Sequence, residues 1–188
     1  EQVNIWNYQG LLYQVLGDLR QAESYLQRGL KLSQEIGDEA GQAYVLSNLG
    51  QVACDRGDLA TAERQLTDGL AIAQKQDDKR LVSYCLSYMS IVSLQAGKLE
   101  LALEQGKAAL ALHKEMDLRL YTADDLATLA AAHLAIGDLT QALECAQLSW
   151  IILEECGGEG PEFPQRDYFI CYQVFSAAGQ AERARAAL

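Results

Sequence analysis

The stretch that decides the fold is "GDLATAERQL" at residues 57–66. It appears forty residues earlier as "GDLRQAESYL" (17–26) and eighty residues later as "GDLTQALECA" (137–146), with a weaker copy, "GKLELALEQG", at 97–106. A fixed period is typical of repeat architectures, in which each unit stacks on the next to bury one continuous core. The regular spacing therefore indicates a repeat architecture, and by itself it does not indicate a catalytic or binding site.

The residues of this stretch have local structural roles. "AYVLSNLGQVACDR" at 43–56 is a helix-forming run, and Gly57 ends it because glycine accepts the left-handed conformation without a Cβ clash. Asp58 suits the N-cap of a second helix, expected at about 58–75, whereas Lys98 at the same register is expected to cap poorly. Each unit is therefore predicted to be a helical hairpin. A recurrent alanine marks a place where two backbones approach closely, at Ala22, Ala62, Ala102 and Ala142.

The composition favours helices and an acidic surface. The chain has 188 residues, of which 49% are hydrophobic, and only two prolines. Its 26 acidic and 15 basic residues give a net charge of -11, and no basic run is present. Such a surface repels phosphate backbones and anionic membranes, so we expect no nucleic acid and no membrane partner. No stretch is long and apolar enough to span a bilayer, and "EQVNIWNYQG" lacks the features of a signal peptide.

Residues that could carry chemistry are few. Five cysteines without a CxxC pair predict reduced thiols and a cytoplasmic protein. "HKEMD" at 113–117 is interpreted as a solvated helix end, His133 as a packing residue, and the "DD" pairs at 77–78 and 124–125 as helix starts. A nucleophile pair of Cys85 with His133 stays open, but no orienting group or oxyanion donor accompanies it. With no phosphate loop and no metal spacing, we expect no enzyme activity, cofactor or metal.

The order of landmarks resembles the tetratricopeptide repeat. In that family a large residue, Leu-Gly and an aromatic line the first helix, a Gly-Asp turn follows, and Ala and a large apolar residue lie in the second. The resemblance implies an all-α fold, a right-handed α-solenoid of stacked antiparallel helical hairpins. The period here is 40 rather than 34 residues, which resembles the long-period subtype with helices longer by about one and a half turns. HEAT-like repeats share a period near 40 but lack the Gly-Asp turn. The landmarks that fit in the first two units are Trp6, Gly10, Tyr13, Gly17, Ala22, Leu26 and Gly29, then Leu46, Leu49, Gly50, Gly57, Ala62, Leu66 and Gly69.

The predicted organisation is a single solenoid with a break near its end. "CGGEGPEFPQRD" at 156–167 interrupts helix with glycines and prolines, and repeat landmarks then resume. Because the first unit opens without a cap and the last stops within a helix, we expect a fragment of a longer protein. The units are predicted at about 3–40, 41–80, 81–120 and 121–156, followed by a loop at 157–166 and a partial fifth unit at 167–188.

The tail narrows the resemblance. The Gly/Pro loop followed by "RDYFICYQVFSAAGQAERARAAL" is similar to the last repeats of large bacterial multidomain regulators. In those proteins a nucleotide-binding signalling ATPase module precedes a long tetratricopeptide sensor array. None of the ATPase motifs is present in this sequence. The resemblance implies that this chain is a sensor or scaffold segment of such a protein.

A partner is expected on the concave side, which first helices line in stacked hairpins. Residues at steps of three and four beside the packing stripe face this groove. Tyrosine and asparagine suit peptide recognition through rigid amphipathic area and amide hydrogen bonds. The Asn48-Leu49-Gly50 context resembles that of tetratricopeptide asparagines that bond a peptide main chain. The predicted groove residues are Asn7, Tyr8, Tyr44, Ser47, Asn48, Gln51, Tyr84, Ser87, Tyr88 and Thr128.

Three functions remain open on the sequence. The first is a non-catalytic scaffold or sensor that binds a protein or peptide in the groove. The second is a sensor of a small molecule or short signal peptide in the same groove, since tyrosine stacking fits it equally well. The third is a segment that self-associates through its terminal repeats. The absence of Lys and Arg from the groove columns argues against the family's carboxylate-clamp subtype.

Overall fold

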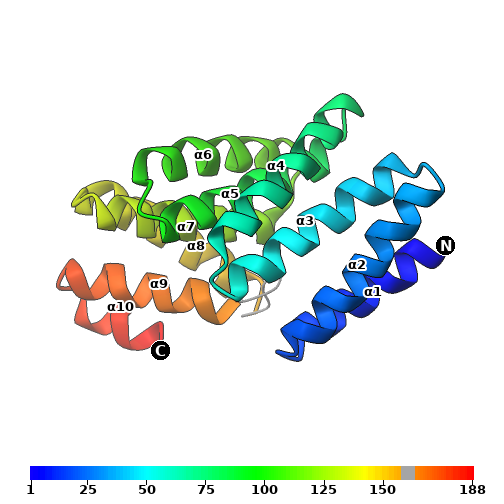
Figure 1. The fold of residues 1–188 in the computed structure, drawn as a ribbon. Helices are drawn as coiled ribbons and strands as arrows, with labels where there is room; N and C mark the ends of the chain where they lie inside the picture. Colours follow the sequence, from blue (N-terminus) through cyan, green and yellow to red (C-terminus); the bar gives the residue numbers. More distant parts are fainter. Residues whose placement is uncertain (158–163) are drawn as a thin grey trace. The chain divides into compact units, whose positions relative to one another are not determined.

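The computed structural model describes residues 1–157 and 164–188, which are almost entirely α-helical and contain no strand. The all-α class predicted from composition is therefore confirmed. Figure 1 shows successive helices joined by tight turns into antiparallel hairpins. The helices are α1 (Gln2–Val15), α2 (Leu19–Glu35), α3 (Glu39–Asp55), α4 (Leu59–Lys75), α5 (Lys79–Gln95), α6 (Leu99–Glu115), α7 (Arg119–Ala135), α8 (Leu139–Glu155), α9 (Pro164–Ala177) and α10 (Ala181–Ala186).

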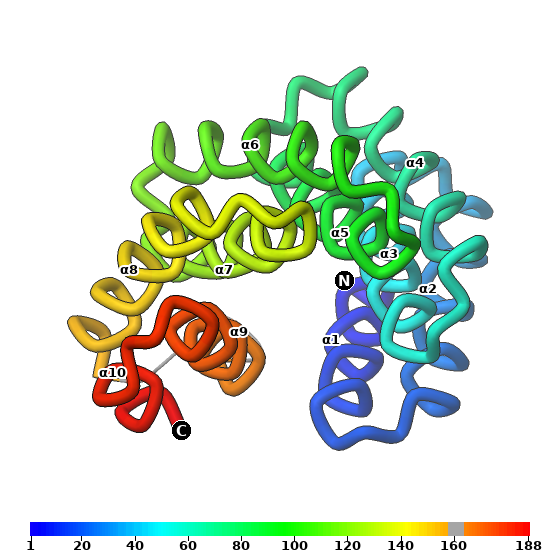
Figure 2. Tube along the Cα trace, turned by 90° about the vertical axis from the view of Figure 1, so that its left-hand side faces the viewer, coloured from blue at the N-terminus to red at the C-terminus, as the bar shows by residue number. Residues whose placement is uncertain are grey.

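The chain forms two compact units, Glu1–Val92 and Ser93–Leu188, and the boundary falls within α5. In unit 1, α1 packs on α2, α2 on α3, and α3 on α4, so that hairpins stack through neighbouring helices. In unit 2, α6 packs on α7, α7 on α8, and α9 on α7, α8 and α10 (Figure 2). Each unit thus has the stacked-hairpin arrangement that the repeat predicts.

The turn within each hairpin is built as the opening stretch predicts. Gly57 has φ +76°, its N–H bonds to the Cys54 carbonyl at 2.9 Å, and Asp58 N–H bonds to the Ala53 carbonyl at 2.9 Å. The Asp58 carboxylate then caps α4 by accepting a hydrogen bond from Thr61 N–H at 3.2 Å. Lys98 makes no side-chain cap at the same register, as predicted.

The turn between hairpins has the same conformation, so the backbone repeats every 20 residues. Gly37 has φ +69°, and Asp77 and Asp117 both have φ +55°. Aspartate tolerates the left-handed region better than most residues, which allows it to replace glycine there. Helices α2 to α8 are accordingly each 17 residues long.

Close approach of helices explains the recurrent small residues. A Cβ atom added at Gly50 would lie 2.6 Å from Leu66 Cγ, too close for any side chain without movement of the leucine. Leu66 itself is fully buried. The predicted close-packing alanines, Ala22, Ala62, Ala102 and Ala142, all have no exposed surface.

The core of unit 2 ends in an aromatic cluster. Phe175 of α9 is fully buried, and Trp150 of α8 packs edge-on against it with ring centroids 6.1 Å apart. Tyr168 also packs edge-on against Trp150, with ring centroids 5.4 Å apart. Helix α9 begins at Pro164, inside the predicted 157–166 loop, because proline is favoured at the first helical position. Residues 158–163 of that loop lie outside the described residues.

Two interpretations of unit 2 are wrong. His113 is not on a solvated helix end: its side chain is fully buried, and its Nδ1 lies 2.6 Å from Asp125 Oδ2. Asp124 and Asp125 lie inside α7 rather than at its start, and they face different partners. In a sequence, an acidic pair near a basic residue is typical of an exposed surface, whereas here Asp125 contacts His113 of α6 and Asp124 pairs with Arg166 of α9.

Candidate functional site

The first helices of the two leading hairpins present a polar surface in unit 1. Asn48 of α3 donates a hydrogen bond from Nδ2 to Asn7 Oδ1 of α1 at 2.7 Å. Both side chains are half-buried, so each amide keeps further donor or acceptor capacity beyond this bond. The structure therefore brings together two of the predicted groove residues.

Tyr44 extends this surface along α3. Its hydroxyl donates to Asp78 Oδ2 at 3.2 Å, while Asp78 Oδ1 caps α5 by accepting from Leu81 N–H at 3.0 Å. Burial raises the pKa of Tyr44, and the negative charge of Asp78 raises it further. The phenol therefore stays a neutral hydrogen-bond donor at physiological pH.

A pocket of about 350 Å³ opens between α1 and α3 on this surface. Asp38 is the one charged residue in its lining, and it also caps α3 by accepting from Gly41 N–H at 2.9 Å. The sequence analysis did not single out Asp38, so its place in the pocket was missed. The residues that line the pocket are Val3, Asn4, Asn7, Tyr8, Asp38, Ala40, Gly41, Tyr44 and Val45.

Three of the predicted groove residues are buried and offer little surface to a ligand. Ser47 is 2% exposed and its hydroxyl interacts with the Cys85 thiol. Gln51 is 4% exposed. Thr128, in unit 2, is 4% exposed and donates its hydroxyl hydrogen to the Asp124 carbonyl at 3.0 Å.

The remaining predicted residues lie on α5. Tyr84, Ser87 and Tyr88 are half-buried. Tyr88 packs against the core cluster that contains Leu66 and Val92. None of the three lines the pocket between α1 and α3. The structure therefore places Asn7, Tyr8 and Tyr44 around the pocket, with Asn48 bonded to Asn7, whereas Tyr84, Ser87 and Tyr88 do not line it.

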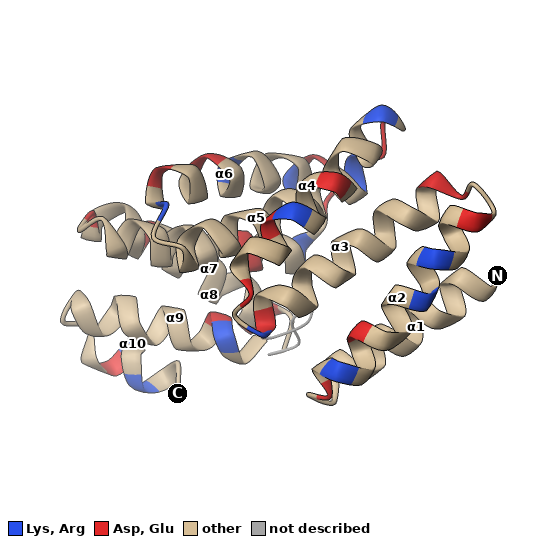
Figure 3. Cartoon of the chain, in the orientation of Figure 1, with Lys and Arg blue, Asp and Glu red and all other residues tan. Residues whose placement is uncertain are grey.

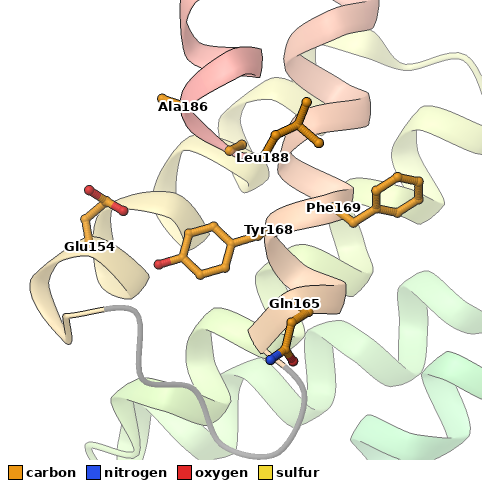
Figure 4. A pocket seen from close by; sticks show the side chains of 7 residues that line it. Glu154, Gln165, Tyr168, Phe169, Ala186 and Leu188 are labelled. Carbon is orange, nitrogen blue, oxygen red and sulfur yellow. The ribbon is translucent and has the colours of Figure 1, made fainter.

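Unit 2 has a second pocket that the sequence analysis did not foresee. It has a volume of about 480 Å³ between the end of α8, the start of α9 and the last residues of the chain. Figure 4 shows Tyr168 pointing toward Glu154 across it. Burial raises the pKa of Tyr168, and the Glu154 charge adds to the effect. The other residues that line it are Gln165, Phe169, Ala186, Ala187 and Leu188.

The raised pKa values of two buried cysteines argue against a nucleophilic role for either thiol. Burial raises the pKa of Cys85 to about 11 and that of Cys171 to about 12, so both remain thiols at neutral pH. Within residues 1–157 and 164–188, no group of three or more His, Cys, Asp or Glu could hold a metal ion. Over the same ranges, no helix has both the length and the apolar character needed to cross a membrane.

These features agree with one recurrent architecture. Residues 1–75 match the tetratricopeptide repeat. That region holds α1 to α4, and therefore both helices of the pocket between α1 and α3. No curated protein matches the sequence.

Several solved structures share the fold of nearly the whole chain. BtubC (BKLC) from P. vanneervenii is 21% identical with a TM-score of 0.75, and the match covers 95% of this chain and 74% of that one. A Rap protein complexed with Competence and Sporulation Factor is 15% identical with a TM-score of 0.86, covering 99% of this chain and 52% of the Rap chain. The nearly identical TPR-like repeats of a putative kinesin light chain from Podosopora anserina are 16% identical with a TM-score of 0.73, covering 98% and 90%. These similarities show the fold, and they confirm the predicted solenoid class.

Proposed function

We propose that this chain is a non-catalytic module that binds a peptide or an extended protein segment at the pocket between α1 and α3. The observation that carries the proposal is the Asn48–Asn7 amide pair, held at 2.7 Å beside the pocket. An amide that already bonds a neighbour is held in orientation, and it can direct its remaining groups at a peptide backbone. The exposed Tyr8 ring beside it, 69% accessible, supplies rigid amphipathic area.

The similarity to a Rap protein supports a peptide as the ligand. That protein is complexed with Competence and Sporulation Factor, and its fold matches 99% of this chain. Since this chain spans about half of the Rap chain, a place within a larger bacterial signalling or regulatory protein, in the cytoplasm, is part of the proposal. The thiols held protonated at Cys85 and Cys171 accord with a binding rather than a catalytic role.

A selection from a library of random peptides tests this function. Enriched peptides are titrated by fluorescence polarisation against the wild type and Asn7→Ala/Asn48→Ala, which removes both amides together. We expect at least a tenfold weaker Kd, which corresponds to about 1.4 kcal/mol. Gln34→Ala, on the exposed end of α2, is the matched control and should bind as the wild type does. Equal affinity of all three proteins would place binding elsewhere.

A small-molecule sensor is the second candidate, because the volume of about 350 Å³ falls within the range of ligand pockets. A thermal-shift screen against metabolites separates the two functions, since a bound ligand stabilises the folded state by mass action. A metabolite that raises Tm in the wild type but not in Asn7→Ala/Asn48→Ala would favour this candidate over the peptide.

A further inference from the structure

The carboxylate of Asp38 uses only one of its two oxygens to hold the fold. Its Oδ1 caps α3 by accepting a hydrogen bond from Gly41 N–H at 2.9 Å. Its Oδ2 accepts no hydrogen bond from any of the described residues, although Asp38 lines the pocket between α1 and α3. An ionised carboxylate can accept about four hydrogen bonds, so Oδ2 can accept one from a ligand.

The next repeat shows how the second oxygen is used when a partner is present. Asp78 lies forty residues after Asp38, and its Oδ1 caps α5 in the same way, by accepting from Leu81 N–H at 3.0 Å. Its Oδ2, however, accepts a hydrogen bond from the Tyr44 hydroxyl at 3.2 Å. The residue forty positions before Tyr44 is Asn4, which is shorter than tyrosine and lines the pocket. The oxygen that Tyr44 engages in one repeat is therefore available to a ligand in the other.

Two small residues leave room around this carboxylate. Gly41 stands where the next repeat has Leu81, and a Cβ atom added at Gly41 would lie 2.3 Å from Asp38 Oδ2. A side chain at position 41 would therefore displace the carboxylate from its place. Asn4, in turn, occupies less space than the tyrosine at its register. Both small residues line the pocket of about 350 Å³, so a group of a ligand has space to reach Asp38 Oδ2.

The charge of the pocket favours a cation as that group. Asp38 is the one charged residue of its lining, and α1 contains no Asp, Glu, Lys or Arg and is tan throughout in Figure 3. The Lys75 ammonium lies 2.9 Å from Glu39, so this pair is already formed. A charged donor makes a stronger hydrogen bond to a carboxylate than a neutral one does. The net charge of -11 adds a long-range attraction for positive ligands.

We propose that the peptide bound at this pocket places a positively charged nitrogen against Asp38 Oδ2. The nitrogen belongs to a lysine or arginine side chain or to the amino terminus of the peptide. This inference rests on the proposed function and specifies the chemistry of its ligand. In this arrangement the Asn48–Asn7 pair orients the peptide backbone, whereas Asp38 selects the charge of one group.

Parallel selections from one random peptide library test the inference. The targets are the wild type, Asp38→Asn and the matched control Asp18→Asn. Asparagine caps a helix about as well as aspartate, so both variants lose one charge and keep the cap. Asp18 caps α2 by accepting from Gln21 N–H at 3.1 Å and does not line the pocket. We expect the wild type and Asp18→Asn to enrich peptides with a positive charge at one fixed position, and Asp38→Asn to lose this preference.

Neutral analogues of an enriched peptide identify the source of the charge. Norleucine replaces lysine, citrulline replaces arginine, and acetylation removes the charge of the amino terminus. By fluorescence polarisation, we expect one analogue to bind the wild type at least tenfold more weakly than the charged peptide. The same analogue and the charged peptide are expected to bind Asp38→Asn within about twofold of each other, because the charge then has no partner.

The outcomes separate this inference from the function on which it rests. Equal binding of every analogue to the wild type, or an equal loss of affinity in the wild type and Asp38→Asn, overturns the pairing with Asp38. If Asn7→Ala/Asn48→Ala still weakens that peptide at least tenfold, the proposed function survives the result. A library that enriches no peptide refutes both.

A tyrosine at position 4 provides a second test. Asn4→Tyr places a hydroxyl at the register of Tyr44, where it can donate to Asp38 Oδ2 and occupy the space of the cation. We expect the charged peptide to bind this variant at least tenfold more weakly than the wild type. Gln27→Tyr adds the same ring on the exposed side of α2, outside the pocket, and is expected to bind as the wild type does. Unchanged affinity of Asn4→Tyr would show that no cation occupies the space beside Asp38.

Discussion

His113 Nδ1 lies 2.6 Å from Asp125 Oδ2, and both side chains are buried within unit 2. The pair connects the end of α6 to α7. The equivalent positions of the repeat in unit 1 are occupied by neutral side chains. The residues at the same register in unit 1 are Ser33 with Val45 and Ala73 with Cys85, and all four are fully buried. The repeat therefore tolerates either neutral side chains or a His–Asp pair at this buried position, and the His113–Asp125 pair is specific to the contact between α6 and α7.

Breaking this pair on one side is expected to destabilise the protein. Asp125→Val alone removes the carboxylate that contacts the buried imidazole, and we expect a loss of about 1–3 kcal/mol in the free energy of unfolding. His113→Ser/Asp125→Val copies the unit 1 residues and is expected to recover most of this loss, because it removes both partners of the buried hydrogen bond together. Urea denaturation of the three proteins measures both values. Additive losses in the double variant would show that the two side chains are not coupled.

A cap can be added where the repeat lacks one. Lys98 makes no side-chain cap, whereas Asp138 at the same register accepts from Gln141 N–H at 3.1 Å. Lys98→Asp is expected to raise the free energy of unfolding by about 1 kcal/mol, because the carboxylate satisfies an orphan N–H and suits the positive end of α6. Lys98→Ala is the control, since it removes the lysine without adding an acceptor. Equal stability of the two variants by chemical denaturation would contradict a capping effect.

The buried carboxyl of Asp167 predicts a pH dependence of stability. Burial raises its pKa well above the usual range and the nearby Asp124 charge raises it further, although Arg166 donates to both carboxylates, at 3.1 Å and 2.7 Å. A raised pKa means that the folded state binds the proton more tightly than the unfolded state. This contribution is complete below the unfolded pKa of about 3.9 and is lost as pH rises through the folded pKa.

Asp167→Asn removes that titration. We expect its Tm to exceed that of the wild type at neutral pH, and the difference to shrink toward zero at about pH 3, below the unfolded pKa, where Asp167 is protonated in both states of the wild type. Thermal melts across this pH range measure the difference. A Tm difference that stays constant with pH would show that Asp167 does not change protonation over this window.

Much of the fold could be predicted from the sequence because the determinants are local. Glycine before aspartate predicts the stop of one helix and the start of the next, and Gly57, Asp58 and Ala62 fulfil these roles. The 20-residue backbone period was missed because Asp77 and Asp117 adopt the left-handed conformation that glycine adopts elsewhere. A sequence shows residue types, whereas this turn depends on a backbone angle that both types can reach.

The candidate site could be predicted only in part. Asn7, Tyr8, Tyr44 and Asn48 were identified because helical spacing places them beside the packing stripe, and the structure gathers them. Ser47, Gln51 and Thr128 have the same spacing but are buried, because the width of the exposed stripe depends on how closely the neighbouring helix packs. The spacing of residues along one helix gives no information about the distance between that helix and its neighbour.

The sequence alone determined the positions of helices, turns and close contacts, since each depends on a few adjacent residues and a strict register. Only the tertiary structure decided which polar groups meet: Asn48 with Asn7, Tyr44 with Asp78, and His113 with Asp125 lie 41, 34 and 12 residues apart. The physical reason is the same in each case, because burial and pairing belong to the contact between helices and not to any helix by itself.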